Sequence, residues 1–239
     1  MRAMIAVSAC LAAALAFSAC SSPAKRAPAA PPPTATVNPY PQRDVTVEQL
    51  QAMALTLDEF GPRYATFGTA IDAPMTAVLE RALMACDVEK EQTALSEQAW
   101  VRGYARHFDQ PEGSGHETLT VGSDLDLFST AQNAIAKIAY DNRSLQENAR
   151  RSASCNGFSI ERIEQFEVTG IGDEAGGLRI NFSYLGVRGQ STVVYFRRDR
   201  LVAQVSVARL NSEDSSAEMI ELAKKIDARM LPVLTSPLT

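Results

Sequence analysis

The sequence predicts an α+β domain in which a mostly antiparallel sheet is flanked by helices, preceded by N-terminal helices. Three observations predict this class. Apolar and polar residues alternate with period two in several stretches between residues 98 and 210. The links between most of these stretches are short, which requires antiparallel neighbours. Two longer segments carry apolar residues at helical spacing, and each apolar stripe needs a sheet face to cover it.

The N-terminal part of the domain is predicted to be helical. A capping box that begins at Thr46 precedes apolar residues at helical spacing, so we expect a helix over residues 47–57 that ends before Gly61-Pro62. Asp72 is positioned to cap a second helix. The apolar stripe of that helix includes Cys86, which therefore faces the core.

The remaining elements follow in the order β-β-α-β-β-β-β-α. The expected strands are 100–108, 118–127, 160–168, 178–184, 191–198 and 201–210. The first two are expected to form a hairpin around the turn 110–115, and the last is apolar on both faces, as in a central strand. Helices are expected over about 129–151 and from the capping pair Ser215 and Glu218 to Pro232. We see one folded unit, residues 44–239.

Residues 1–19 have the composition of an export signal. Arg2 is the only charge, and a short apolar stretch of about 15 residues follows it. The stretch ends in Phe17-Ser18-Ala19-Cys20, which resembles the lipobox of bacterial lipoproteins. This resemblance implies cleavage before Cys20 and acylation of that cysteine. The usual leucine is replaced by Phe17, and ordinary signal cleavage or an uncleaved anchor are the alternatives.

Residues 20–43 are predicted to be a tether. The segment 21–43 contains seven prolines and no acidic residue, a composition that favours extended polyproline II. The four basic residues of 1–43 leave 19 of the 23 basic residues for 44–239, against all 28 acidic ones. The domain is therefore acidic, which excludes nucleic acid as a partner because such proteins need a basic footprint.

Two cysteines remain for the folded domain. Cys10 leaves with the signal, and Cys20 is the predicted lipidation site. Cys86 and Cys155 form an even pair in an exported chain, which favours a disulfide. Two buried free thiols are the alternative.

The element order resembles the PsbP-like and LpqN-type sandwich. The resemblance covers about residues 98–231 and includes the turn Gly170-Ile171-Gly172-Asp173-Glu174-Ala175, which also resembles actinobacterial lipoproteins of unknown function. It implies an assembly factor, sensor or ligand-binding module, and it supplies no catalytic residue. This turn lacks the residues of a phosphate loop. We therefore interpret it as a tight turn in which glycine adopts a positive φ.

Few side chains suggest chemistry. His107 and His116 flank the predicted hairpin turn, near Asp109, but two histidines are too few for a zinc site, and we predict no metal. Asp124 and Asp126 share one face of a strand, where a solvated face is more common than an acid–base pair. Arginines 197, 198 and 200 are expected at an exposed hairpin tip.

These features favour a lipid-anchored, extracytoplasmic, non-enzymatic binding or sensor module of the cell envelope, with no cofactor. The alternative is an envelope structural or assembly factor that acts on a protein partner, and an envelope hydrolase is a third possibility. The expected partners are the membrane, through the lipid, and an apolar small molecule or envelope protein. If the ligand is apolar, its contacts are expected from Phe182, Tyr184, Val205 and Val207, and the alternative is that these residues are plain core. The histidines, beside a wet turn, are not expected to contribute to binding.

Overall fold

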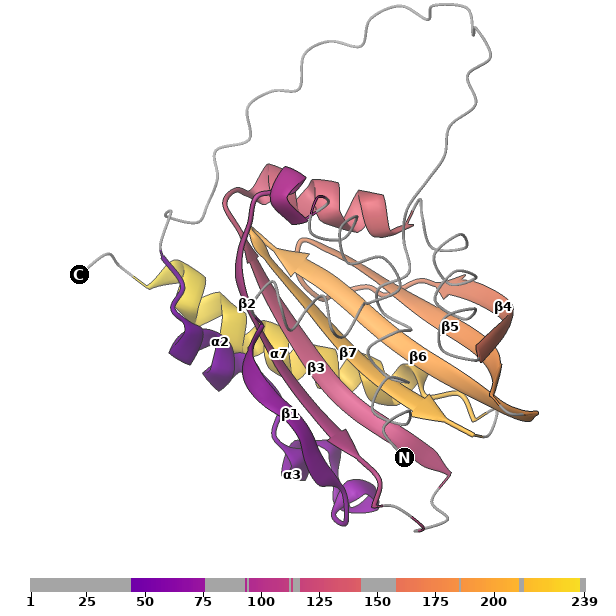
Figure 1. Cartoon of the computed structure of the whole chain (residues 1–239). Helices are drawn as coiled ribbons and strands as arrows, with labels where there is room; N and C mark the ends of the chain where they lie inside the picture. Colours follow the sequence, from indigo (N-terminus) through magenta and orange to yellow (C-terminus); the bar gives the residue numbers. More distant parts are fainter. Residues whose placement is uncertain are drawn as a thin grey trace, which may run out of the picture.

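The domain is built on one seven-stranded sheet whose neighbouring strands are all antiparallel (Figure 1). The computed structural model describes residues 44–75, 93, 95–111, 113, 117–142, 158–184, 186–210 and 213–236. The strands are β1 (Gly68–Met75), β2 (Trp100–Asp109), β3 (Thr118–Phe128), β4 (Phe158–Phe166), β5 (Glu174–Tyr184), β6 (Val187–Arg198) and β7 (Leu201–Arg209). Their spatial order is β1-β2-β3-β7-β6-β5-β4.

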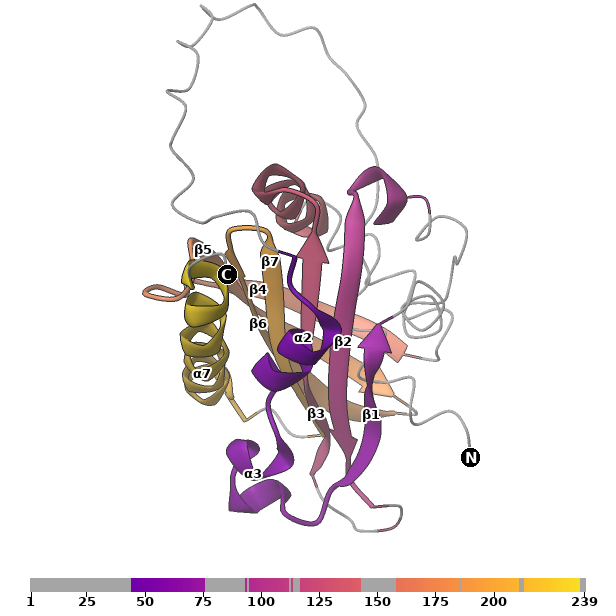
Figure 2. The same cartoon turned by 90° about the vertical axis from the view of Figure 1, so that its left-hand side faces the viewer.

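Helices cover both faces of the sheet. One face carries α2 (Val47–Met53), α3 (Leu57–Phe60), the 3-10 helix η1 (Pro62–Tyr64) and α7 (Ser216–Thr235) (Figure 2). The opposite face packs against a helix over residues 131–142, through a cluster that contains Phe128, Ala134, Ile138 and Val202. Among the described helices, none combines the length and the apolar character needed to cross a membrane.

The predicted α+β class and the antiparallel meander are confirmed. The strands β2 and β3 form the expected hairpin. The predicted central strand is β7, which lies between β3 and β6 and is buried along nearly its whole length. The two long helices pack on opposite faces, as their apolar stripes required.

One strand was not predicted. Asp72 does not begin a helix, because residues 68–75 form β1, which pairs with β2. The Asp72 carboxylate accepts hydrogen bonds from the Tyr104 hydroxyl at 2.5 Å and from Nε of Arg106 at 2.8 Å. Pro74 is tolerated because β1 is an edge strand, where a missing N–H costs no ladder bond. The rest of the expected helix, with Cys86, lies outside the described residues.

The first predicted helix is interrupted. The capping box at Thr46 is present, but α2 ends at Met53 and a second box, at Thr56, begins α3. Between them the Leu55 N–H donates to Oγ of Ser123 in β3 at 3.1 Å. Arg229 donates to the carbonyls of Met53 and Ala54, at 3.2 Å each. These tertiary hydrogen bonds satisfy the polar groups of the break, which sequence periodicity cannot reveal.

The helix after β3 begins one residue later than expected. Thr130, not Ser129, accepts the hydrogen bond from the Asn133 N–H, at 3.1 Å. The described part of this helix covers 131–142, and its predicted continuation to 151 lies outside the described residues.

The ends of α7 also differ from the prediction. Ser215 is the N-cap residue, but its side chain makes no capping bond. The Glu218 carboxylate binds Tyr64 and Arg209. Pro232 does not stop the helix, which continues to Thr235. A proline removes only its own N–H, and its carbonyl still accepts from the Ser236 N–H at 3.0 Å.

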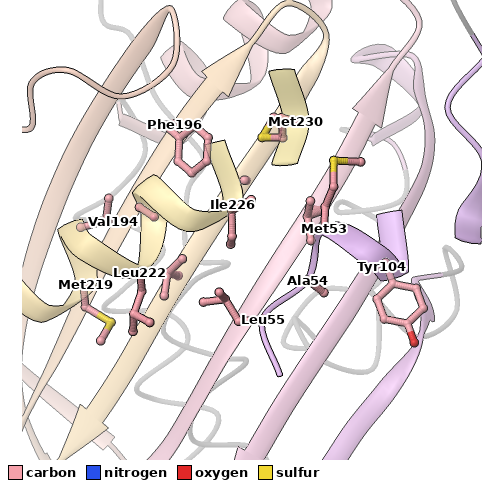
Figure 3. Close-up of a cluster of buried hydrophobic side chains, with 14 of the residues drawn as sticks. Met53, Ala54, Leu55, Tyr104, Val194, Phe196, Met219, Leu222, Ile226 and Met230 are labelled. Atoms are coloured by element: carbon pink, nitrogen blue, oxygen red, sulfur yellow. The ribbon is translucent and has the colours of Figure 1, made fainter. Parts of the chain in front are cut away.

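The main hydrophobic core lies between α7 and the sheet (Figure 3). The predicted stripe of α7 is fully or almost fully buried, and it consists of Met219, Leu222, Ala223, Ile226 and Met230. Phe196 of β6 packs in the same cluster, and Met53 and Leu55 extend it beneath α2. This face of the sheet is therefore closed by tightly packed apolar side chains.

The residues expected to contact an apolar ligand do not share one cavity. Val205 and Val207 belong to the core beneath α7, whereas Phe182 belongs to a separate cluster with Ile180 on β5. All are almost completely buried. The side chain of Tyr184 lies outside the described part of the chain.

The glycine turn has the predicted backbone. Gly170 and Gly172 adopt φ angles of 76° and 61°, which favour glycine. The turn is shorter than expected, because β5 already begins at Glu174.

Candidate functional site

Polar side chains gather on the sheet face opposite α7. The register aligns Gln204 of β7 with Asp124 of β3, and Ser206 of β7 with Gly122, which in turn pairs with His107 of β2. Asp126 lies two residues beyond Asp124 and therefore faces the same side. We call these five residues the polar layer: His107, Asp124, Asp126, Gln204 and Ser206.

His107 and Asp124 form a buried pair. Nε2 of His107 lies 2.7 Å from Oδ1 of Asp124, and the histidine is 4% exposed. Burial disfavours the charged imidazole, but the adjacent Asp124 carboxylate outweighs burial, so the pKa of His107 is raised. A Cβ at position 122 would lie 2.5 Å from Nδ1 of His107. Glycine at that position therefore lets the imidazole lie against β3.

Asp126 is held by the indole of Trp100, whose Nε1 donates to Oδ1 at 2.7 Å. Burial raises the pKa of Asp126 to about 6, against the opposing effects of the Trp100 hydrogen bond and the Lys137 charge. Lys137, from the helix over 131–142, is bound to Asp141 at 2.7 Å. Burial also raises the pKa of Asp141.

Two buried polar atoms of the layer lack a hydrogen-bond partner among the residues that the structure describes. They are Oγ of Ser206 and Nδ1 of His107, and each residue is 4% exposed. A buried polar group without a partner costs about 1–3 kcal/mol. The layer therefore holds unsatisfied hydrogen-bonding capacity in its interior.

The structure places the sequence candidates differently from expectation. His107 is not in a wet turn but is buried on β2, next to the edge strand, while His116 lies outside the described residues. Asp124 and Asp126 do share a face, but that face is largely covered rather than solvated. Within the described ranges, no three histidine, cysteine or acidic side chains are grouped to hold a metal ion.

Sequence reasoning missed Gln204, Ser206, Trp100 and Lys137 as members of this site. The available signal was polarity inside an otherwise apolar strand, because Gln204 and Ser206 interrupt β7. The spacing of apolar residues predicted that this strand is buried on both faces. It did not predict that one of the two faces carries buried polar side chains.

Two arginines of the β6–β7 hairpin, Arg197 and Arg198, already bind acidic side chains of this chain. Nη1 of Arg197 donates to Asp173 at 3.2 Å and to the Asp199 carbonyl at 3.0 Å. Arg198 forms a paired hydrogen bond with Asp227 of α7, both distances being 2.6 Å. The prediction of a solvated tip is therefore wrong for these two side chains, which tie the hairpin to α7 and to the glycine turn.

A second feature is a hollow of about 450 Å³ on the α7 side of the sheet. It is lined by Glu48, Gln51, Ala52, Ala54, Thr56, Glu59, Arg106 and Arg229. Both of its arginines are already paired, because Arg106 binds Asp72 and Arg229 binds Glu59. The hollow has no unsatisfied buried group comparable to Ser206.

We expect mild acid to stabilise the domain. Asp126 has a folded-state pKa of about 6 against 3.8 for the free side chain, so the folded state binds the proton more tightly and gains stability as the pH falls through 6. The pKa of His107 is also raised in the folded state, which acts in the same direction. The stability that this raised pKa contributes is present at acidic pH and is lost as the pH rises above 6.5. From pH 8 to pH 5 the gain should be on the order of 2 kcal/mol.

Urea unfolding at several pH values measures this gain. Trp100 is the only tryptophan of the chain, so its fluorescence should titrate with Asp126, with a midpoint near pH 6. Asp126→Asn should abolish that titration and flatten the stability profile. Equal stability of the wild type at pH 5 and pH 8 would contradict the burial of this carboxyl group.

Comparison with known proteins identifies the fold. No protein-family model and no curated protein matches the chain. Among solved structures it is similar to the extracellular domain of PknH from Mycobacterium tuberculosis, at 14% identity and a TM-score of 0.51, covering 79% of this chain and 98% of that domain. A protein of unknown function from Pseudomonas aeruginosa aligns at 12% identity and a TM-score of 0.28, over 59% of this chain and 86% of that one. The chain thus shares the fold of an actinobacterial extracellular domain.

Proposed function

We propose that this protein is a lipid-anchored, extracytoplasmic binding module whose ligand occupies the polar layer. The Phe17-Ser18-Ala19-Cys20 motif and the proline-rich segment 21–43 support the anchor and the tether. The fold shared with an extracellular domain supports the location outside the cytoplasm.

The unpartnered Oγ of Ser206 is the observation that carries the binding role. This hydroxyl and Nδ1 of His107 are buried beside the Asp124 carboxylate without a partner among the described residues. A ligand that supplied the missing hydrogen bonds would recover the cost of burying them. Beneath α7, the opposite face is filled by tightly packed apolar side chains.

A binding role fits these residues better than a catalytic one. A histidine oriented by a carboxylate, such as His107 with Asp124, is the base of many hydrolases. Its nucleophile must lie within hydrogen-bond reach of the base. The hydroxyl of the polar layer is that of Ser206, and it makes no hydrogen bond to His107.

The anchor is tested by Cys20→Ala. The substitution removes the residue that would carry the acyl chains, so the protein should move from the membrane fraction to the soluble fraction. Cys10→Ala, within the apolar stretch of the signal, should leave the protein in the membrane fraction. Partition of Cys20→Ala into detergent like the wild type would show that the lipobox assignment is wrong.

Binding is tested by thermal unfolding of the detergent-solubilised protein with amines, sugars, carboxylates, fatty acids and divalent metals. A polar organic compound should raise the unfolding temperature and saturate, with a stabilisation of about 2.7 kcal/mol at 100 times its dissociation constant. Ser206→Ala should weaken that effect, and Ser183→Ala, on β5, should not. A shift with fatty acids alone, or with no compound, would contradict binding at the polar layer.

A further inference from the structure

Carboxylates outnumber cations around the polar layer. Asp109, Asp124, Asp126 and Asp141 supply four carboxyl groups. Among the residues that the structure describes, the nearby cations are Lys137 and His107, so two of these four negative charges have no described counterion even when His107 is protonated. Arg197 on β6 is already bound to Asp173 and to the Asp199 carbonyl.

The layer also provides the surfaces that organic cations prefer. Trp100 and Tyr195 both pack against the cluster of Phe128, Ala134, Ile138 and Val202. Tyr195 pairs with Gln204 in the register, and Trp100 holds Asp126. Aromatic rings beside carboxylates attract ammonium and guanidinium groups through both charge and the ring quadrupole.

The carboxylates are within reach of a ligand. The side chain of Asp124 is 15% exposed and that of Asp141 is 30% exposed, whereas Ser206 is buried. The unpartnered Ser206 hydroxyl lies on the same face of the sheet as Asp124 and Asp126, two residues along β7 from the partner of Asp124 in the register.

We propose that the ligand of the polar layer is an organic cation with N–H donors, a primary ammonium or a guanidinium group, bound between Asp124 and Asp126. This rests on the proposed binding function and names its ligand class. The N–H groups donate to the two carboxylates, and the Ser206 hydroxyl accepts a further hydrogen bond. A metal ion is disfavoured because the described residues contain no group of three metal ligands.

The test follows Trp100 fluorescence in the detergent-solubilised full-length protein. The probe is 1,4-diaminobutane at pH 7.5, and 1,4-butanediol of the same length is its neutral control. The diamine should change the fluorescence in a saturable way, while butanediol and sodium chloride of equal ionic strength should not. Trp100 is the single tryptophan and contacts Asp126, so the signal originates in the layer.

Variants distinguish diamine binding at the polar layer from nonspecific attraction to the negative charge of the chain. Asp124→Asn and Asp126→Asn should each weaken diamine binding by about tenfold or more, because a charge-assisted hydrogen bond is lost. Glu221→Gln removes an exposed carboxylate of α7 and should leave binding unchanged. Unfolding temperatures of all variants identify any that fail to fold, and the butanediol comparison on the wild type needs no variant.

The outcomes distinguish this inference from the proposed function. Equal responses to the diamine and to butanediol, or a response to zinc but not to the diamine, would overturn the cation assignment. A saturable shift with a sugar and none with amines would keep the binding module and also overturn the assignment. No response to any compound in the wider panel would overturn both.

Discussion

Replacing Arg209 with alanine is expected to lower the free energy of unfolding by about 3–5 kcal/mol. Arg209 is 1% exposed, and its Nη2 donates to the Tyr64 hydroxyl and to Oε2 of Glu218, both at 2.6 Å. The Tyr64 hydroxyl in turn donates to Oε1 of Glu218 at 2.7 Å. Burial and Glu218 raise the pKa of Tyr64 to about 12. Truncation would leave the Glu218 carboxylate without its cation.

Urea unfolding at pH 7 measures the effect, and the neighbouring Arg63 provides a matched control. Arg63 forms a paired contact with Glu213, but its side chain is 39% exposed. Exposed pairs contribute about 0–1 kcal/mol, so Arg63→Ala should be nearly neutral. A cost for Arg209→Ala no greater than that for Arg63→Ala would show that the buried network does not hold the Tyr64 segment to α7.

Replacing Gly172 with alanine is expected to cost about 2–5 kcal/mol, from backbone strain and steric overlap together. Gly172 has a φ of 61°, and a Cβ there would lie 2.4 Å from the Arg197 carbonyl oxygen. That carbonyl accepts the Asp173 N–H at 2.7 Å. The substitution would therefore force apart the contact that joins the turn to β6.

Substitution of Gly170 separates the cost of backbone strain from the cost of steric overlap. Its φ is 76°, and nothing lies within 4 Å of a Cβ built there. Gly170→Ala should therefore show only the backbone strain, about 1–2 kcal/mol. Thermal or urea unfolding of both variants measures the difference. Equal costs for the two substitutions would mean that the turn can move away from β6 without loss.

The candidate site divides into what a sequence can and cannot predict. Period-two alternation placed Asp124 and Asp126 on one face of a strand, and the structure confirms it. The partners of these carboxylates lie far along the chain: Trp100 precedes them on another strand, and Gln204 follows them 80 residues later. Such pairs depend on the sheet register and on the position of β7 between β3 and β6, which no local pattern specifies.

Predictions of helix capping from residue type were also wrong where the same side chain makes a tertiary contact instead. Asp72 has the residue type of a helix cap, but the hydroxyl of Tyr104 and the guanidinium of Arg106 satisfy its carboxylate within the sheet. Glu218 is correctly spaced for a capping box after Ser215, but it binds the buried Arg209 instead. A charge-assisted bond to a buried arginine is stronger than a neutral capping bond, so it prevails.

The sequence by itself determined the α+β class, the hairpins, the central strand and the helix stripes, because these follow from the spacing of apolar residues within short segments. It also determined the positive φ of the glycine turn. Only the tertiary structure decided that His107 is buried against Asp124, that Arg209 is enclosed, and that Ser206 has no partner among the described residues. Burial and partner choice are properties of residues brought together across the sheet, and the energy of a charged or polar side chain depends on those neighbours rather than on its own position in the chain.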